Sequence, residues 1–104
     1  MLKKEQMIPG THLIVNDLIK DGVPSLAPGM PANQVKDHMS MFVGKLGELD
    51  GREVHLLSGD VLVVEKGPRK VQGVNVCRVR RGLSQSIGEV YWCELRMSAR
   101  LRDA

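Results

Sequence analysis

The sequence predicts a mostly β fold, a small barrel of five strands with one short helix in an N-terminal insertion. Residues 57–95 are rich in β-branched side chains, and short apolar runs there alternate with turns that contain Gly, Pro or Asp. The only aromatic residues are Phe42, Tyr91 and Trp92, so Val, Leu, Ile and Met must supply the core. The 104 residues have room for one domain with one modest core.

The β-rich stretch is expected to contain three strands. Ser58-Gly59-Asp60 is typical of a turn, because Gly tolerates positive φ and Asp bonds to nearby backbone. The four apolar residues 61–64 are too few for a helix and predict the first strand. Gly67-Pro68 should end it, since proline lacks the N–H that a strand ladder needs. Residues 74–81 and 88–95 predict the second and third strands. Imperfect alternation in the second indicates a bulge or burial on both faces at one end.

The N-terminal half is expected to hold one strand followed by a long insertion. Residues 12–17 are the strand candidate, ended by Asn16-Asp17. The insertion covers residues 18–50. Its segment 23–33 contains three prolines, each of which pushes the preceding residue towards extended geometry. Regular structure is therefore not expected in that segment.

The helix is predicted within the insertion, over residues 33–43. Asn33 can serve as the N-cap and Gly44 can end the helix. Four apolar residues recur at the spacing of one helical face: Val35, Met39, Phe42 and Val43. The alternative interpretation is a strand over residues 41–43.

Asp50-Gly51 carries the strongest local signal in the chain. It predicts a two-residue type I′ hairpin turn, because both residue types tolerate positive φ. The strand that follows should point Val54 and Leu56 to one face and Glu53 and His55 to the other.

The two ends of the chain carry weaker signals. Residues 96–104 fit either a last helical turn or a final strand. The termini, residues 1–7 and 102–104, should be loosely ordered.

Charge divides the chain into two parts. Residues 1–65 carry six Lys/Arg against nine Asp/Glu, a balance of −3, whereas residues 66–104 carry nine against three, a balance of +6. A basic C-terminal part can face nucleic acid, an acidic protein or a partner subunit.

The sequence favours a cytoplasmic protein with no membrane partner. No apolar run approaches the ~20 residues of a membrane helix, and the first ten residues lack the apolar centre of a secretion signal. Cys77 and Cys93 lie on strands expected to be neighbours. They are interpreted as two buried free thiols in a reducing cytosol, although pairing between them stays open.

Catalytic and cofactor motifs are not found in the sequence. His12, His38 and His55 are far apart and belong to no spaced metal or triad motif. The segment Gly44-Lys45-Leu46-Gly47 lacks the length and the Lys-Ser/Thr pair of a phosphate-binding loop. We therefore expect no enzyme activity, no metal and no cofactor.

Three steps in the β-rich stretch recur in a known family. Residues 57–63 show a hydrophobic-Gly-Asp step before a strand, residues 76–81 a strand of mixed apolar and basic residues, and residues 88–93 a Gly-x-Val-Gly-Trp-Val type strand in which Tyr91 stands in place of a Gly. In these steps the chain resembles the SH3-like small barrel, in particular bacterial SH3-type domains. The resemblance implies a five-stranded barrel whose first strand and large loop come from the N-terminal half. The aromatic pairs that grip Pro-rich peptides in eukaryotic SH3 domains have no counterpart at residues 73–77, so that activity is not expected.

The Arg-rich C-terminal part contains the candidate binding site. Arg78 and Arg80 share one face of the second strand, and guanidinium groups match phosphate and carboxylate geometry. Joined by Arg96 and an aromatic side chain, they would form a platform of charge and ring. Trp92 is expected in the core, which leaves Tyr91 facing outwards. The candidate binding residues are Arg69, Lys70, Arg78, Arg80, Arg81, Tyr91 and Arg96.

The first functional hypothesis is a non-enzymatic module that binds or assembles with a protein through this basic face. One alternative is binding to the RNA or DNA backbone. Another is a homo-oligomer with a small-molecule site between its subunits, because so small a barrel encloses no ligand cavity. The remaining interpretation is a solvated face that only protects a strand edge.

Overall fold

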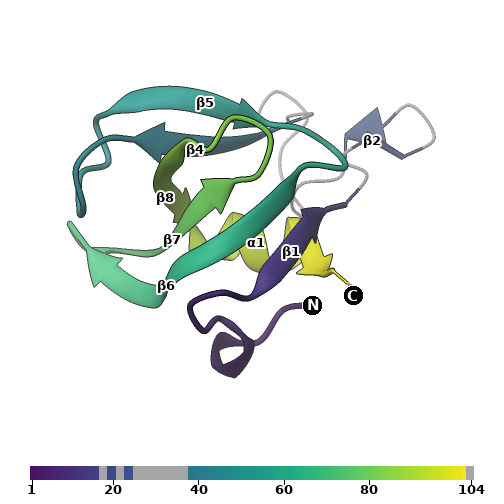
Figure 1. The fold of residues 1–104 in the computed structure, drawn as a ribbon, viewed down its shortest axis with the longest axis horizontal. Coiled ribbons are helices and arrows are strands. Elements are labelled where there is room, and N and C mark those ends of the chain that lie inside the picture. Colours follow the sequence, from purple (N-terminus) through teal and green to yellow (C-terminus); the bar gives the residue numbers. More distant parts are fainter. Residues whose placement is uncertain (17–18, 21–22, 25–37, 103–104) are drawn as a thin grey trace.

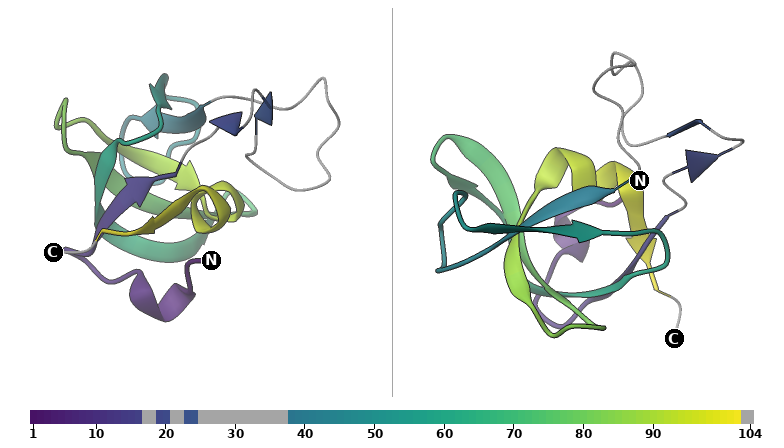
Figure 2. Two further views of the ribbon diagram at one scale, coloured as in Figure 1. Left: turned by 90° about the vertical axis from the view of Figure 1, so that its right-hand side faces the viewer. Right: turned by 90° about the horizontal axis from the view of Figure 1, so that it is seen from above.

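A seven-stranded antiparallel sheet dominates the computed structural model, which describes residues 1–16, 19–20, 23–24 and 38–102. The strand order is β5-β4-β8-β7-β6-β1-β9, and β2 pairs separately with β3. The sheet curls, as the perpendicular views of Figures 1 and 2 show, and the buried hydrophobic residues lie on its inner face. The prediction of a mostly β fold is confirmed. The elements in chain order are η1 (Lys4–Gln6), β1 (His12–Val15), β2 (Ile19–Lys20), β3 (Val23–Pro24), β4 (Met39–Val43), β5 (Arg52–Leu56), β6 (Val61–Val71), β7 (Val74–Arg81), β8 (Ile87–Tyr91), α1 (Trp92–Ser98) and β9 (Ala99–Leu101).

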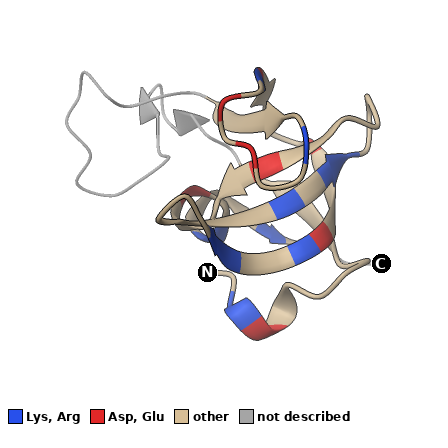
Figure 3. Cartoon of the chain, turned by 90° about the vertical axis from the view of Figure 1, so that its left-hand side faces the viewer, with Lys and Arg blue, Asp and Glu red and all other residues tan. Residues whose placement is uncertain are grey.

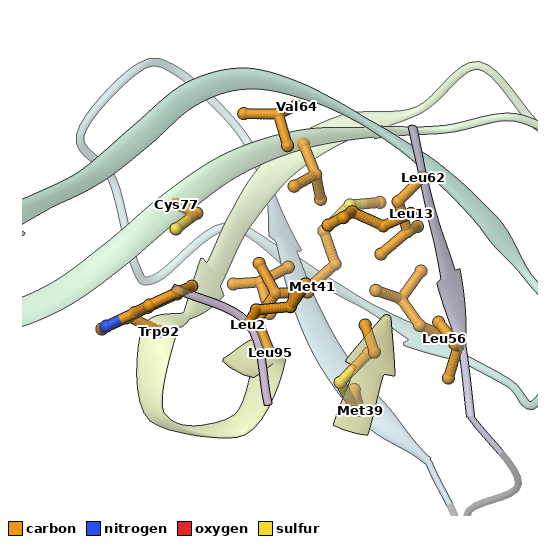
Figure 4. Packing of buried hydrophobic residues seen from close by; sticks show 14 of the residues in the cluster. Leu2, Leu13, Met39, Met41, Leu56, Leu62, Val64, Cys77, Trp92 and Leu95 are labelled. Atoms are coloured by element: carbon orange, nitrogen blue, oxygen red, sulfur yellow. The ribbon is translucent and has the colours of Figure 1, made fainter. Parts of the chain in front are cut away.

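The core lies on the inner face and is made of aliphatic and sulfur-containing side chains, as the low aromatic content predicts. Alternate residues of the strands point inwards, and Trp92 and Leu95 of α1 pack against them (Figure 4). Trp92 is only 5% exposed, so its predicted place in the core is confirmed. Leu13, Met39, Met41, Leu56, Leu62 and Leu95 are fully buried.

The first seven residues pack onto this core, although the sequence suggested a loose start. Leu2 and Met7 are buried, and the Leu2 N–H donates to the carbonyl oxygen of Arg96 at 3.0 Å. Gly67 approaches this segment so closely that an added Cβ would lie 2.4 Å from the Met7 carbonyl oxygen. Only glycine fits at that crossing, and the N-terminal segment is held against β6 there.

Gly67-Pro68 does not end β6, contrary to expectation. The strand continues to Val71, and its register with β7 shifts between Val64 and Lys66 and again between Lys66 and Arg69. Such irregularities accommodate a proline, which cannot donate to the ladder. On β7, Val76 and Cys77 are both fully buried, so the predicted burial on both faces at one end is confirmed.

The two-residue hairpin turn forms at Gln72-Gly73, not at Asp50-Gly51. Gln72 has φ 51° and Gly73 has φ 81°, the pair of positive values that a type I′ turn requires. This turn joins β6 to β7. Asp50-Gly51 instead ends the longer loop of residues 44–51 between β4 and β5, and neither residue has a positive φ. The prediction was wrong because the β4–β5 connection runs from residue 44 to residue 51, and a loop of that length does not need a two-residue type I′ turn at Asp50-Gly51.

The predicted helix over residues 33–43 is wrong where the structure describes it, since Met39–Val43 is β4; residues 33–37 lie outside the described part. The alternative strand over residues 41–43 is correct. β4 pairs with β5 and β8, and this pairing outweighs the weak propensity of a short helix. Val23–Pro24, expected to be irregular, pairs as β3 with β2; residues 25–33 lie outside the described part.

Two further predicted elements are present. The strand predicted over residues 12–17 is found as β1, which ends at Val15; residue 17 lies outside the described part. The turn at Ser58-Gly59-Asp60 is also present. There the Asp60 carboxylate accepts a 2.8 Å hydrogen bond from the Leu57 N–H, while the Asp60 N–H donates to the Leu57 carbonyl oxygen.

The predicted third strand, residues 88–95, ends early. β8 stops at Tyr91, and Trp92 begins α1, whose residues Trp92, Leu95 and Ser98 are buried at helical spacing. Both alternatives for the C-terminal segment occur in succession, because β9 follows the helix and pairs with β1. Among the described residues, no helix combines the length and apolar character that crossing a bilayer needs.

Candidate functional site

The outer face of the sheet carries most of the candidate residues. Cross-strand partners share a face, so the pairing registers assign side chains to rows across the strands. One row crosses five strands, from the basic side of the sheet to its β5 edge. Its members are Lys66, Arg78, Glu89, Phe42 and Glu53. A neighbouring row contains Arg69, Val76 and Tyr91.

A buried carboxylate, Glu89, organises this face. Its side chain is 0% exposed and accepts hydrogen bonds from Arg69 Nη2 on both oxygens, 2.8 Å to Oε2. Arg78 Nη1 donates to Glu89 Oε1 at 3.1 Å, and Arg78 Nη2 donates to the Gly44 carbonyl oxygen at 3.1 Å. A buried charge needs such pairing, since an unpaired carboxylate there would be costly. Two arginines on one carboxylate leave a net positive charge.

Sequence reasoning missed the role of Glu89. The available signal was a lone acidic residue inside the otherwise uncharged strand Ile87–Tyr91. Since charged residues are rarely fully buried without a partner, such a position indicates a buried ion pair.

Arg80 and Arg81 also have acidic partners. Arg80 Nε lies 3.4 Å from Glu65 Oε1, and Arg81 Nη2 lies 3.0 Å from Asp60 Oδ2. Strand alternation directs Arg80 to the outer face and Arg81 to the other face. Lys70, a predicted candidate, is exposed. Lys66, which was not among the candidates, is exposed as well. Basic positions thus recur along β6 and β7, with one acidic residue, Glu65, among them (Figure 3).

The predicted platform of arginines and an aromatic ring does not assemble as a whole. Tyr91 is half-buried, and its ring meets Phe42 edge-on with centroids 5.5 Å apart. Arg96 lies on α1, on the core side of the sheet, with its guanidinium carbon 6.0 Å from the centroid of the Trp92 ring. The outer face therefore holds Arg69, Arg78, Arg80 and Tyr91, but neither Arg96 nor Arg81.

Arg96 borders two open surface hollows instead. One has a volume of about 310 Å³ and is flanked by residues of the N-terminal segment, including Lys3 and Lys4. The other, about 380 Å³, is flanked by Gly73, Val74 and Asn75 at the β6–β7 turn. Trp92 lines both hollows, but its low exposure leaves little ring surface for a ligand.

The two cysteines are free, and only one of them is buried. Cys77 lies in the core and Cys93 is exposed on α1, which corrects the expectation of two buried thiols. Burial raises the pKa of Cys77 to about 12, with the Arg69 charge opposing the rise and the Glu89 charge adding to it. Cys77 therefore stays protonated at neutral pH and is not an activated nucleophile.

His38 and His55, far apart in the sequence, come together at the β4–β5 hairpin. Their rings stack with centroids 3.7 Å apart and an interplanar angle of 20°. Glu53 Oε1 lies 3.6 Å from His55 Nε2. His12 remains separate, with Nδ1 3.0 Å from the Gly10 carbonyl oxygen. Sequence spacing alone did not show this cluster, because strand pairing creates it.

Comparison with known proteins finds no match to a family model, to a curated protein or to a solved structure.

Proposed function

We propose that the chain is a non-enzymatic, SH3-like binding module that docks an acidic protein surface on the outer face of β6, β7 and β8. The SH3-like assignment is supported by five strands that are consecutive neighbours, β9-β1-β6-β7-β8. The β4–β5 hairpin adds to this set beside β8, with β4 inside the predicted insertion and β5 directly after it.

The observation that carries the proposal is the basic outer face fixed by Glu89. Four cationic residues and two acidic ones lie along β6, β7 and β8 there: Lys66, Arg69, Arg78, Arg80, Glu65 and Glu89. Glu89 orients Arg69 and Arg78 in advance, which lowers the conformational cost of docking. Arginine and tyrosine are also the residue types that contribute most often to protein interfaces, and Tyr91 lies in the same row as Arg69.

A protein partner is favoured over nucleic acid. Binding of single strands relies on exposed aromatic rings that stack on bases, whereas Trp92 is buried and Tyr91 packs against Phe42. Carboxylates interleaved with the cations also repel a phosphate backbone. The free thiols of Cys77 and Cys93 support a reducing compartment such as the cytosol for this role.

The test compares two charge reversals of equal size. Arg78 is unsuitable as a binding probe because it also holds Glu89, so the outer-face variant is Lys66→Glu with Arg80→Glu. The control is Lys3→Glu with Lys4→Glu, two exposed residues at and before η1. The probes are a fluorescent poly-glutamate peptide and a fluorescent oligo(dT) strand, measured by anisotropy across a salt series.

The outer-face variant should bind the acidic peptide at least about tenfold more weakly, a loss of ~1.4 kcal/mol, while the control stays near the unmodified chain. Equal losses in both variants would show that net charge alone drives binding. Tighter binding of oligo(dT), with a steep fall as salt rises, would favour the nucleic-acid alternative.

A further inference from the structure

We propose that His38, Glu53 and His55 form a binding site for one zinc-class divalent metal ion. One ligand atom from each of the three side chains lies within 4.8 Å of those of the other two. The site is separate from the basic face on β6 and β7, so it does not depend on the protein-binding function proposed above.

Strand geometry explains why these residues converge. Glu53 and His55 are two residues apart on β5 and therefore share a face. Ser40 of β4 pairs directly with His55, and Phe42 pairs with Glu53, which assigns that face to the outside of the sheet. His38 immediately precedes β4 and follows the same alternation as Ser40. The pairing of β4 with β5 thus brings together ligands that are 15 and 17 residues apart in the sequence.

The donor set selects the class of ion. Two imidazole nitrogens and one carboxylate oxygen suit zinc and related transition metals, and a set of three protein ligands leaves a fourth position for water. Calcium and magnesium prefer oxygen ligands alone. In a tetrahedral zinc site with bonds of about 2.0–2.1 Å, ligand atoms lie roughly 3.4 Å apart. The two imidazole rings now stack with an interplanar angle of 20°, so their nitrogens would converge on one ion only after the rings rotate out of this stack.

The surroundings of the cluster support this role. The Ser40 hydroxyl donates to Glu53 Oε1, which orients the carboxylate beside the imidazoles. The side chains of His55 and Glu53 are 56% and 45% exposed, so an ion can reach them from solvent. An ion held there would link the residue before β4 to the edge strand β5, and its binding would stabilise the folded hairpin.

The experiment uses the full chain with Cys93→Ser, which removes the exposed thiol as a competing ligand. Calorimetric titration with Zn²⁺ should give one site per chain, and Co²⁺ should give the visible absorption of a tetrahedral complex with nitrogen and oxygen donors. His38→Gln and His55→Gln should each weaken Zn²⁺ binding by at least about tenfold, and Ser40→Ala by a smaller factor. His12→Gln is the matched control and should leave the affinity within about twofold.

Circular dichroism checks that each variant is folded. The variants are expected to fold because the side chains of this cluster, such as His55 and Glu53, are largely exposed. Unchanged Zn²⁺ affinity in a folded His38→Gln, His55→Gln double variant would overturn the proposal, because the metal would then bind elsewhere. Absence of Zn²⁺ binding at about 1 mM, an affinity too weak to matter, would overturn it as well. Ca²⁺ that displaces Zn²⁺ at equal concentration would contradict the assignment of the ion class.

Discussion

Two carboxylates flank Phe42 on the outer face of the sheet, and their environments are opposite. Glu89 pairs with Phe42 from β8, is fully buried and binds two arginines. Glu53 pairs with Phe42 from β5, is half-exposed and lies beside a serine hydroxyl and an imidazole. The same residue type in the same row thus meets permanent cations on one side and neutral or titratable groups on the other.

The difference shows how burial determines what a carboxylate does. Inside the sheet, removal from water demands full compensation, so Glu89 is fixed to Arg69 and Arg78 and serves the structure. At the edge strand, water still solvates Glu53, so its partners can be exchanged. An exchangeable carboxylate beside two imidazoles is suited to capture an ion, whereas a buried and saturated one is suited to hold a surface rigid.

The largest expected effect comes from breaking the Glu89 cluster. Glu89→Gln leaves two guanidinium groups without their counter-charge and should lower the free energy of unfolding by about 3–5 kcal/mol. Glu53→Gln, the matched substitution across Phe42, should cost less than about 1 kcal/mol. Urea unfolding followed by circular dichroism measures both. Similar losses at the two positions would remove the contrast between buried and exposed carboxylates.

Replacing the whole cluster sharpens the same test. A variant with Glu89→Leu, Arg69→Met and Arg78→Met should recover most of the stability lost by Glu89→Gln, since apolar residues of similar volume need no counter-charge. Acidic-peptide binding should be weaker in that variant than in the unmodified chain, because its outer face has lost two cations. Strong binding there would mean that Arg69 and Arg78 act only in folding.

The second-largest effect comes from ionisation of the buried Cys77 thiol. Cys77 lies on the core face of the sheet and pairs with Val90, the residue that follows Glu89. Burial raises the pKa of Cys77 from 9.0 to about 12, so the folded state keeps a proton that the unfolded state releases. The contribution of the thiol is fully present below pH 9 and is lost as pH rises from 9 towards 12, with a slope of up to about 1.4 kcal/mol per pH unit.

Unfolding measured between pH 8 and 11 for the unmodified chain and for Cys77→Ala tests this linkage. The difference in stability between the two proteins should shrink as pH rises, because lysines and tyrosines titrate in both and cancel. A constant difference would mean that the thiol ionises equally in the folded and unfolded states.

The smallest expected effect comes from the Gln72-Gly73 turn, which joins β6 to β7, the strands that carry the arginine partners of Glu89. Gln72 has a positive φ in the β6–β7 hairpin, close to Arg69, and asparagine tolerates that conformation better. Gln72→Asn should therefore raise the unfolding free energy by up to about 1 kcal/mol. Gln85→Asn is the control: Gln85 also has a positive φ, but its side chain bonds Gly82 and Arg80 and should give no net gain.

Features that depend on a few neighbouring residues were predicted from the sequence alone. The mostly β character, the turn at Ser58-Gly59-Asp60 and the strand β1 follow from local composition and alternation. The place of Trp92 in the core also follows, because a chain with three aromatic residues has few large side chains to bury. The sequence likewise determined which residue types, mainly arginines, are available for the candidate site.

The tertiary structure decided which of these residues meet and which elements persist. Residues 39–43 fit a helical spacing but form β4 because β5 and β8 both pair with them. The binding of Glu89 to Arg69 and Arg78, and the meeting of His38 with His55, depend on strand register. Local preferences act over a few residues and carry small energies, whereas register and burial act across strands distant in the sequence. Interactions of the second kind set the electrostatics of this surface.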